Sequence, residues 1–374
     1  MDHRLNDSSH VEPPLGWRRP DQPAVHRPGL SGPGDKLRLS ANESPYGPIP
    51  PVLERMQIAC SRVNRYPDIT GSALRTSLAE RLGVTAEQIV LGSGSSELIH
   101  ALVAAFGDDG AEIMLPYPSF PMYTVSASLT DARVVRVPIA ADGAVDLQAM
   151  ADAVTDATRL IFICNPNNPT GGFHSADALA EFLAKIPPRV CVALDEAYWE
   201  LTDAYVNGAP DSMGLVRQYP NVVVLRTFSK FYGLAGVRMG YAVTCCTTVA
   251  DRLGAARMSA MPNVVALEAA SACLDHFDAY MERAREAARE RNRVTTAAKN
   301  LGYELYPTQT NFYCFAFAPG PEPFLEAGLL VRGGDSIQFP GHVRVSFGTP
   351  EDNDRVLAVL RAHAPVHAQA QPAL

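Results

Sequence analysis

The 374-residue sequence predicts an α/β fold in which a large domain with a doubly wound, mostly parallel sheet is joined to a smaller α+β domain. Between residues 88 and 229, short apolar runs typical of strands alternate with helical runs. These apolar runs lack the in–out alternation of a half-exposed sheet, which is typical of parallel strands covered on both faces. From about residue 264 the pattern changes to a long Ala-rich helical stretch followed by strand-like pieces.

Each element of the large domain is a short segment bounded by polar, Gly or Pro residues. The expected strands are 88–94, 112–118, 134–139, 158–165, 189–195 and 221–229, and the expected helices are 96–106, 121–129 and 175–186. The smaller domain should contain a helix over 264–301, strands within 303–317, 329–334 and 342–349, and a closing helix over 350–363.

We divide the chain at changes in composition and pattern. The expected segments are a Pro-rich arm (1–36), an N-terminal part of the small domain (37–65), the large domain (66–262), the small domain (263–364) and a flexible tail (365–374).

Composition excludes several classes of protein. The net charge is −8 and no basic stripe is present, so a nucleic-acid-binding role is not expected. No apolar run approaches the roughly 18–20 residues that span a bilayer, and the polar start of the chain has no signal-peptide core. The seven Cys are scattered without CxxC spacing. We therefore expect reduced thiols, no metal site and a cytoplasmic location.

Lys230 is the candidate for amine chemistry. The chain has 28 Arg but only four Lys. Lys230 ends the strand-like run 221–229, follows Ser229, and opens a Gly-rich stretch that contains Arg238. An amine beside a hydroxyl and a guanidinium suggests a Schiff-base lysine next to a phosphate site. The other three lysines lie in the Pro-rich arm, at a helix end and in a charged helix: Lys36, Lys185 and Lys299.

Three loops at the carboxyl ends of strands carry further polar side chains, and ligands of open α/β sheets bind at that edge. GSGSSE (92–97) joins a strand to a helix whose N-terminus could bind phosphate, although a tight turn capped by Ser has the same pattern. NPNNPTG (165–171) is a stiff loop that fixes its Asn side chains, or a plain turn. DEAY (195–198) places Asp195 where it could pair with a pyridine nitrogen, or act as a helix cap.

Together these residues resemble the fold type I pyridoxal-phosphate enzymes, and within them the histidinol-phosphate aminotransferase branch. The resemblance runs from about residue 39 to residue 360 with the motifs in the family's order. The motifs are LSANESPYG (39–47), RYPD (65–68), GSGSSE, PSFPMY (118–123), NPNNPTG, DEAY, RTFSKFYGLAGVRMGY (226–241), TNFYCF (310–315) and VRVSFGTPEDN (343–353).

The resemblance implies a role for each matching residue in binding pyridoxal 5′-phosphate. Lys230 would carry the cofactor as a Schiff base and then move the proton between the substrate Cα and the cofactor C4′. Asp195 would pair with the ring nitrogen, and Asn168 and Tyr198 with the phenolic oxygen. Phe120 would stack on the ring. The phosphate would be held by Ser95, Ser96, Ser229 and Arg238.

The resemblance also implies substrate and subunit contacts. Arg344 would grip the substrate carboxylate bidentately, with Arg332 and Asn42 also in contact with substrate. A structural salt bridge is the alternative role for Arg332. Tyr66 would reach the phosphate of a partner subunit, so a homodimer is expected.

The expected activity is an aminotransferase that moves an amino group between an amino acid, with glutamate as donor, and a keto acid or an imidazole-acetol-phosphate-like acceptor. Two residues depart from the family pattern. The family often has an acidic residue at the position of Ser96, and it usually has Tyr at the position of Phe120. One alternative is a decarboxylase of the threonine-phosphate type, because those enzymes share part of the run SKFYGLAG. A second is an aminotransferase of specialised metabolism that acts on aromatic or unusual amino acids. A third is a cofactor-sensing transcription regulator. Only about 40 Pro-rich residues precede the match, which disfavours the regulator.

Overall fold

The computed structural model describes residues 36–108 and 110–365. Almost all of the expected Pro-rich arm (1–36) and tail (365–374) therefore lies outside the described residues. The domain boundaries at 65/66 and 262/263 remain a proposal. Within the described ranges, no helix is long and apolar enough to cross a membrane.

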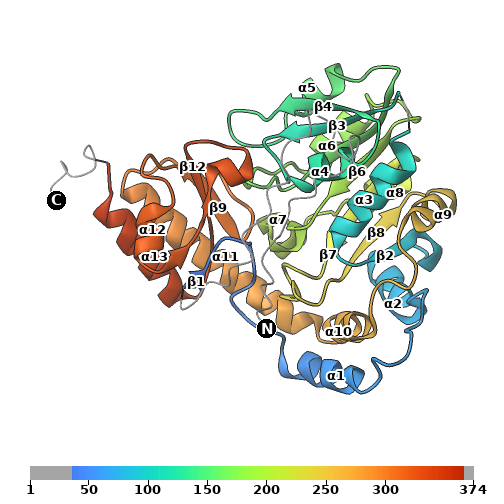
Figure 1. Cartoon of the computed structure of the whole chain (residues 1–374), viewed down its shortest axis with the longest axis horizontal. Coiled ribbons are helices and arrows are strands. Elements are labelled where there is room, and N and C mark those ends of the chain that lie inside the picture. Colours follow the sequence, from blue (N-terminus) through green and yellow to red (C-terminus); the bar gives the residue numbers. More distant parts are fainter. Residues whose placement is uncertain (1–35, 109, 366–374) are drawn as a thin grey trace, which may run out of the picture. The chain divides into compact units, whose positions relative to one another are not determined.

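A seven-stranded sheet with the order β2-β8-β7-β6-β5-β3-β4 forms the main framework (Figure 1). All neighbouring strands pair in parallel except β8, which is antiparallel to both β2 and β7. The strands are β2 (Ile89–Gly92), β3 (Glu112–Tyr117), β4 (Arg133–Pro138), β5 (Thr158–Cys164), β6 (Cys191–Asp195), β7 (Val222–Thr227) and β8 (Gly240–Thr244). Six of the seven were predicted. β8 was missed because it lies inside the Gly-rich stretch that follows Lys230.

Helices cover both faces of this sheet, which is why its strands other than the edge strand β4 read as nearly continuous apolar runs. In β6, Val192 and Leu194 belong to one buried cluster while Ala193, between them, belongs to another. One face packs against α3 (Ser95–Phe106), α4 (Met122–Ala127) and α9 (Thr247–Ala256). The other packs against α2 (Ser72–Leu82), α5 (Leu147–Asp152), α6 (Ala176–Leu183), α8 (Met213–Gln218) and α10 (Val264–Asp275).

A smaller three-stranded antiparallel sheet, in the order β11-β12-β9, has its own apolar core. Its strands are β9 (Phe312–Ala316), β11 (Arg332–Gly333) and β12 (His342–Ser346); next to it β1 (Leu37–Arg38) pairs in parallel with β10 (Leu329–Leu330). The surrounding helices are α11 (Phe277–Asn300), α12 (Glu322–Glu326) and α13 (Pro350–Ala362). The remaining elements are α1 (Pro50–Cys60), α7 (Asp203–Val206) and the 3-10 turns Ala86–Gln88, Trp199–Leu201 and Gly334–Ile337.

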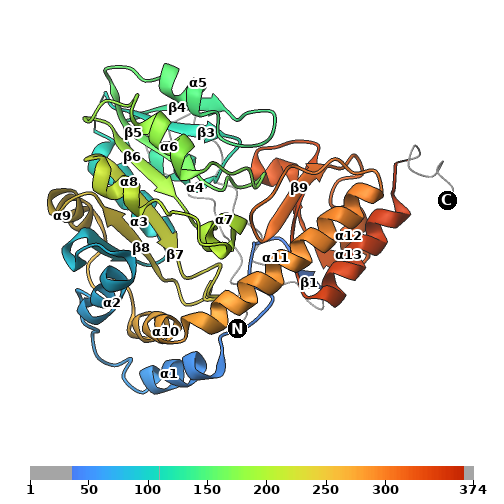
Figure 2. The ribbon, with the colours of Figure 1, turned by 180° about the vertical axis from the view of Figure 1, so that it is seen from behind.

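The single helix expected over 264–301 is wrong: the chain forms two helices, α10 and α11. His276 ends the first with φ −117° and ψ 33°, outside helical geometry. Figure 2 shows α11 running from beside α10 to the small sheet. The break lets α10 cover the large sheet while α11 extends across to the small one.

Candidate active site

The carboxyl edge of the large sheet brings together side chains from three neighbouring parallel strands. Cys164, at the end of β5, is the register partner of Asp195, at the end of β6, and Asp195 is the partner of Leu225 in β7. The loops that leave these strands carry Asn168 and Lys230 to the same edge. The local sequence predicted each strand end, and parallel pairing makes those ends meet.

Lys230 is partly buried, and its amine points at the N-terminal segment. Its Nζ donates hydrogen bonds to the carbonyl oxygens of Ala41 (3.1 Å) and Asn42 (2.9 Å). Burial, together with the nearby guanidiniums of Arg344 and Arg238, lowers the pKa of Lys230 to about 7. A large fraction of this amine is therefore neutral and nucleophilic near neutral pH.

Asp195 is 2% exposed and lies at the carboxyl end of β6. Its Oδ2 accepts a hydrogen bond from the Tyr123 hydroxyl (2.7 Å), and its Oδ1 accepts one from the backbone N–H of Ala197 (3.2 Å). Burial raises the pKa of Asp195 to about 6, against the lowering effect of these two donors. Tyr123 is a site residue that the sequence analysis missed, although it ends the quoted motif PSFPMY.

A chain of side-chain contacts connects the N-terminal segment, the large sheet and the small sheet. Asn42 donates through Nδ2 to the Tyr198 hydroxyl (2.9 Å), and Arg344 donates through Nη1 to Oδ1 of Asn168 (2.6 Å). Arg344 also donates through Nη2 to the carbonyl of Ser40 (2.7 Å). Four of the predicted residues, Asn42, Asn168, Tyr198 and Arg344, are thus linked in two pairs around the site.

Arg344 is a buried cation that lacks an anion among the described residues. It is 5% exposed, and its Nε has no hydrogen-bond partner within the described ranges. Burial lowers its pKa to about 10, with a further contribution from Arg332. A buried guanidinium of this kind is costly without a negatively charged ligand. The site therefore fits a carboxylate or phosphate at Arg344.

Arg332 lies directly across from Arg344 in the register of β11 and β12. Its Nε donates to the same carbonyl, that of Ser40 (3.3 Å). No ion pair of Arg332 is found in the described part of the chain, so the salt-bridge alternative finds no support there. Two guanidiniums on adjacent strands converge on one backbone oxygen.

The start of α3 forms the candidate phosphate cradle. Ser95 and Ser96 are its first two residues, so their backbone N–H groups point out of the helix end. Gly94 has φ +78°, and a Cβ there would lie 2.7 Å from Nη2 of Arg238, so only glycine permits this approach. Ser229 is buried, and its Oγ accepts a hydrogen bond from Thr227 Oγ1 (2.9 Å).

Phe120 and Tyr66 stand apart from these hydrogen bonds. Phe120 is partly buried and makes an edge contact with the ring of Tyr123, with centroids 5.7 Å apart. Tyr66 is 84% exposed. Its role in a partner's site stays a proposal.

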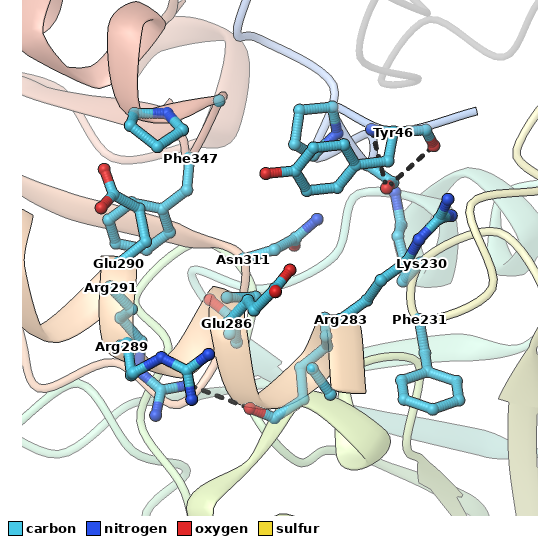
Figure 3. A pocket seen from close by; sticks show the side chains of 18 of the residues that line it. Tyr46, Lys230, Phe231, Arg283, Glu286, Arg289, Glu290, Arg291, Asn311 and Phe347 are labelled. Atoms are coloured by element: carbon cyan, nitrogen blue, oxygen red, sulfur yellow. Dashed lines mark hydrogen bonds between the residues drawn. The ribbon is translucent and has the colours of Figure 1, made fainter. Parts of the chain in front are cut away.

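A cavity of about 450 Å³ adjoins Lys230 (Figure 3). Lys230 and Phe231 lie on one side of it, and Phe347 and Glu290 lie on the other. Tyr46, residues of α11 and residues such as Leu201 and Asn311 also line it. Among the described residues, no group of three or more His, Cys, Asp or Glu side chains is arranged to hold a metal ion.

Comparison with known proteins decides the family. The family model for aminotransferase class I and II matches residues 34–360, which is most of the chain. The chain belongs to this aminotransferase family. An aromatic amino acid aminotransferase of Rhodococcus opacus is 42% identical over 344 residues, covering 90% of this chain and 93% of the relative. A histidinol-phosphate aminotransferase of Bacillus velezensis is 36% identical over 328 residues, covering 87% and 90%.

The fold of this aminotransferase also matches solved structures. The histidinol-phosphate aminotransferase of Sinorhizobium meliloti in complex with pyridoxal 5′-phosphate has a TM-score of 0.80 and 28% identity, covering 88% of this chain and 92% of that one. The chain therefore has the fold of type I pyridoxal-phosphate aminotransferases, and its cofactor is pyridoxal 5′-phosphate.

The residues present fit this cofactor. The Gly94–Arg238 approach at the α3 N-terminus suits a phosphate, and Asp195 keeps lone pairs free beyond its two protein donors. Lys230 supplies the amine. When bound, pyridoxal phosphate withdraws electrons from the Cα of an attached amino acid, so that a Cα proton can leave.

Arg238→Met should weaken binding of pyridoxal phosphate roughly tenfold, because it removes a partly solvated charged donor from the cradle. Titrating the apoprotein with cofactor and following the fluorescence measures the dissociation constant. Arg159→Met is the matched control, because Arg159 is exposed at the start of β5, at the opposite end of the sheet. Equal affinities of the two variants would remove Arg238 from the phosphate site.

Proposed function

We propose that this aminotransferase acts on aromatic amino acids, exchanging the amino group between glutamate and an aromatic 2-oxo acid. The observation that carries the reaction is that Lys230 and Asp195 lie at the carboxyl edge of the large sheet, where Arg344 of the small sheet reaches Asn168. The relatives named aromatic amino acid aminotransferase, 42% identical in one case, support the substrate class. Three aromatic side chains, Tyr46, Phe231 and Phe347, line the cavity beside Lys230 along with charged side chains of α11, and such rings can pack against a planar apolar group.

Each residue has a separate task in this proposal. Arg344 binds the substrate carboxylate through its fork of N–H donors. Lys230, once its amine is free, takes the Cα proton and returns it, and a pKa of about 7 suits both directions. Asp195 is the proposed partner of the ring nitrogen. Asn168 and Tyr198 are the proposed partners of the phenolic oxygen, and Asn42 orients the Tyr198 hydroxyl by donating a hydrogen bond to it.

The position of Arg344 favours amino transfer over decarboxylation, because its guanidinium would hold the substrate carboxylate in place. The buried guanidinium of Arg344 would stabilise an ionised α-carboxylate in the ground state. That stabilisation raises the barrier to losing the carboxylate as carbon dioxide.

The test is a single-turnover screen of the cofactor-loaded protein with one amino acid at a time. Phenylalanine, tyrosine and tryptophan should each change the absorbance of the bound cofactor and release one equivalent of 2-oxo acid. Carbon dioxide release without 2-oxo acid would overturn the proposal in favour of a decarboxylase.

Histidinol phosphate is the second candidate substrate, and the Arg332–Arg344 pair favours it. Two buried or half-buried cations facing one backbone oxygen would also suit a phosphate. The Sinorhizobium meliloti and Bacillus velezensis proteins carry that name. A kcat/KM for histidinol phosphate above that for phenylalanine would select this candidate.

Arg344→Gln should raise the KM for phenylalanine and glutamate about 100-fold, because it removes about 3 kcal/mol of charged hydrogen bonding to the carboxylate. Cofactor content should remain near one per chain. Arg332→Gln is the matched control on the neighbouring strand. It should leave the KM for phenylalanine within about threefold and raise only the KM for a phosphorylated substrate. Parallel losses of cofactor and substrate binding in Arg344→Gln would contradict this assignment.

We also propose a cytoplasmic homodimer in which Tyr66 reaches the partner's site. Large exposed apolar side chains close to Tyr66 in sequence support an interface: Leu53, Ile58, Val63 and Ile69. Sedimentation should give a dimer. Tyr66→Phe should weaken cofactor binding while the protein remains a dimer. A monomer with full activity would refute both statements.

A further inference from the structure

We propose that Tyr123 is a positioning residue for the cofactor, with its hydroxyl fixing the carboxylate of Asp195 and its ring fixing Phe120. The inference rests on the cofactor site and holds whichever amino acid is the substrate. Neither the sequence motifs nor the family resemblance assigned Tyr123 a role.

The hydroxyl of Tyr123 makes one of two hydrogen bonds that orient Asp195. Tyr123 is fully buried on α4, and its hydroxyl donates to Oδ2 of Asp195 (2.7 Å). The N–H of Ala197 donates to Oδ1 (3.2 Å). One donor on each oxygen sets the plane of the carboxylate. The remaining lone pairs are free for the ring nitrogen.

The ring of Tyr123 connects two cofactor contacts. It stacks on Phe162 of β5, with centroids 4.6 Å apart and planes inclined by 12°. It also meets Phe120 edge to face, at 5.7 Å and 87°. Phe120 is the proposed stacking residue, so one side chain contacts both that residue and the partner of the ring nitrogen. Movement of Tyr123 would therefore disturb both the contact with the cofactor's ring face and the contact with its ring nitrogen.

The charges around Asp195 show why a donor is needed there. Burial raises the pKa of Asp195, and the neighbouring Glu196 raises it further, while the Tyr123 hydroxyl lowers it. Cys164 of β5 is also buried beside Asp195, with its pKa raised by burial to about 12, so it adds no negative charge near neutral pH. The pKa of Tyr123 is raised as well, so its hydroxyl keeps the proton that it donates. Tyr123 is therefore the side-chain donor that favours the ionised form of Asp195.

Removing this donor should move a proton from the cofactor ring to Asp195. The pKa of Asp195 would rise, and each unit of rise increases the protonated fraction relative to the ionised fraction tenfold. A protonated Asp195 no longer favours a protonated ring nitrogen, so the ring withdraws electrons less strongly. We expect Tyr123→Phe to lower kcat about tenfold and to shift the acidic limb of the kcat–pH profile to higher pH.

The decisive measurement is the NMR signal of the ring nitrogen in protein loaded with ¹⁵N-labelled pyridoxal phosphate. Tyr123→Phe keeps both ring contacts and loses only the hydroxyl. In this variant the ring nitrogen should be less protonated at pH 7.5 than in the wild type. An unchanged signal would overturn the proposal.

Two comparisons separate positioning from general packing. Tyr313→Phe is the matched control: Tyr313 is 1% exposed in β9, and its hydroxyl has no hydrogen-bond partner in the described ranges. It should leave the ring-nitrogen signal unchanged. In an Asp195→Asn background, adding Tyr123→Phe should have no further effect on the signal, because the hydroxyl acts through Asp195. An equal effect in both backgrounds would show that Tyr123 acts by another route and would refute the proposal.

Discussion

Lys230→Met should abolish turnover with every amino acid while the protein still folds and binds pyridoxal phosphate weakly. Lys230 is the amine that lies at the carboxyl edge of the sheet, hydrogen-bonded to the segment that carries Asn42. Methionine has a similar length and suits a buried position. Loss of the nucleophile and of the proton-transfer group together should exceed the roughly 10²–10⁴-fold effect of one acid–base group. Turnover and the absorbance of the bound cofactor measure the loss.

The same substitution should stabilise the apoprotein, with a defined pH dependence. Burial holds the pKa of Lys230 at about 7, below its ordinary value of 10.5. The unfolded chain binds the proton more tightly than the folded protein. The buried amine therefore lowers the free energy of unfolding most strongly below pH 7, and this destabilisation disappears as pH rises from 7 to 10.5. Lys230→Met should therefore gain about 2–4 kcal/mol at pH 6 and much less at pH 10.

Lys185→Met is the matched control for both results. Lys185 is exposed, and its Nζ donates to Oε1 of Gln148 (2.6 Å). It should keep full activity and show no pH-dependent gain in melting temperature. Retained turnover in Lys230→Met would contradict the assignment of Lys230.

Asp195→Asn should lower kcat about 10²–10⁴-fold while the cofactor stays attached to Lys230. An amide can still accept the hydrogen bond from Tyr123, but it carries no charge to favour a protonated ring nitrogen. The cofactor should therefore bind and react slowly. Rapid-mixing measurement of a single turnover with phenylalanine checks the loss at the proton-removal step.

Asp195→Asn should also stabilise the apoprotein above pH 6. Burial raises the pKa of Asp195 to about 6 from 3.8. The folded state thus binds the proton more tightly than the unfolded chain. The ionised carboxyl therefore lowers the free energy of unfolding above pH 6, and this destabilisation disappears as pH falls from 6 to 3.8. A gain of about 1–3 kcal/mol at pH 8 is expected.

Asp146→Asn provides a contrast for this gain in stability. Asp146 caps α5 by accepting a hydrogen bond from the N–H of Ala149 (2.9 Å). Replacing it should change stability by less than about 1 kcal/mol, because Asn also caps helices. A fall in the stability of Asp195→Asn at pH 8 would refute the account of Asp195 as a buried carboxylate whose ionised form destabilises the apoprotein.

The inner strands of the large sheet, such as β5, β6 and β7, were predictable because their burial on both faces leaves a plain local signal. β8 was not predictable, since its five residues begin at Gly240 within a Gly-rich stretch. The short helix α2 was also unassigned, because its buried side is only Leu74, Leu78 and Ala79. Long-range packing, rather than local pattern, stabilises such elements.

The site followed from sequence where a residue sits at a strand end or in a distinctive loop, as Asp195, Asn168 and Lys230 do. Contacts between distant segments did not follow. Arg344 meets Asn168 across 176 residues, and Tyr123 meets Asp195 across 72. Tyr123 looks like an ordinary helical core residue in the sequence, because its role depends on the fold bringing its side chain against Phe162 of β5 and Asp195 of β6.

The most direct test of the central claim is to locate the lysine that carries the cofactor. Borohydride reduces a carbon–nitrogen double bond between cofactor and lysine to a stable amine, and peptide mapping then identifies the modified residue. With four lysines in the chain, the expected result is modification of the peptide containing Lys230, at one cofactor per chain. Modification at Lys36, Lys185 or Lys299 instead, or no stable modification, would contradict the account.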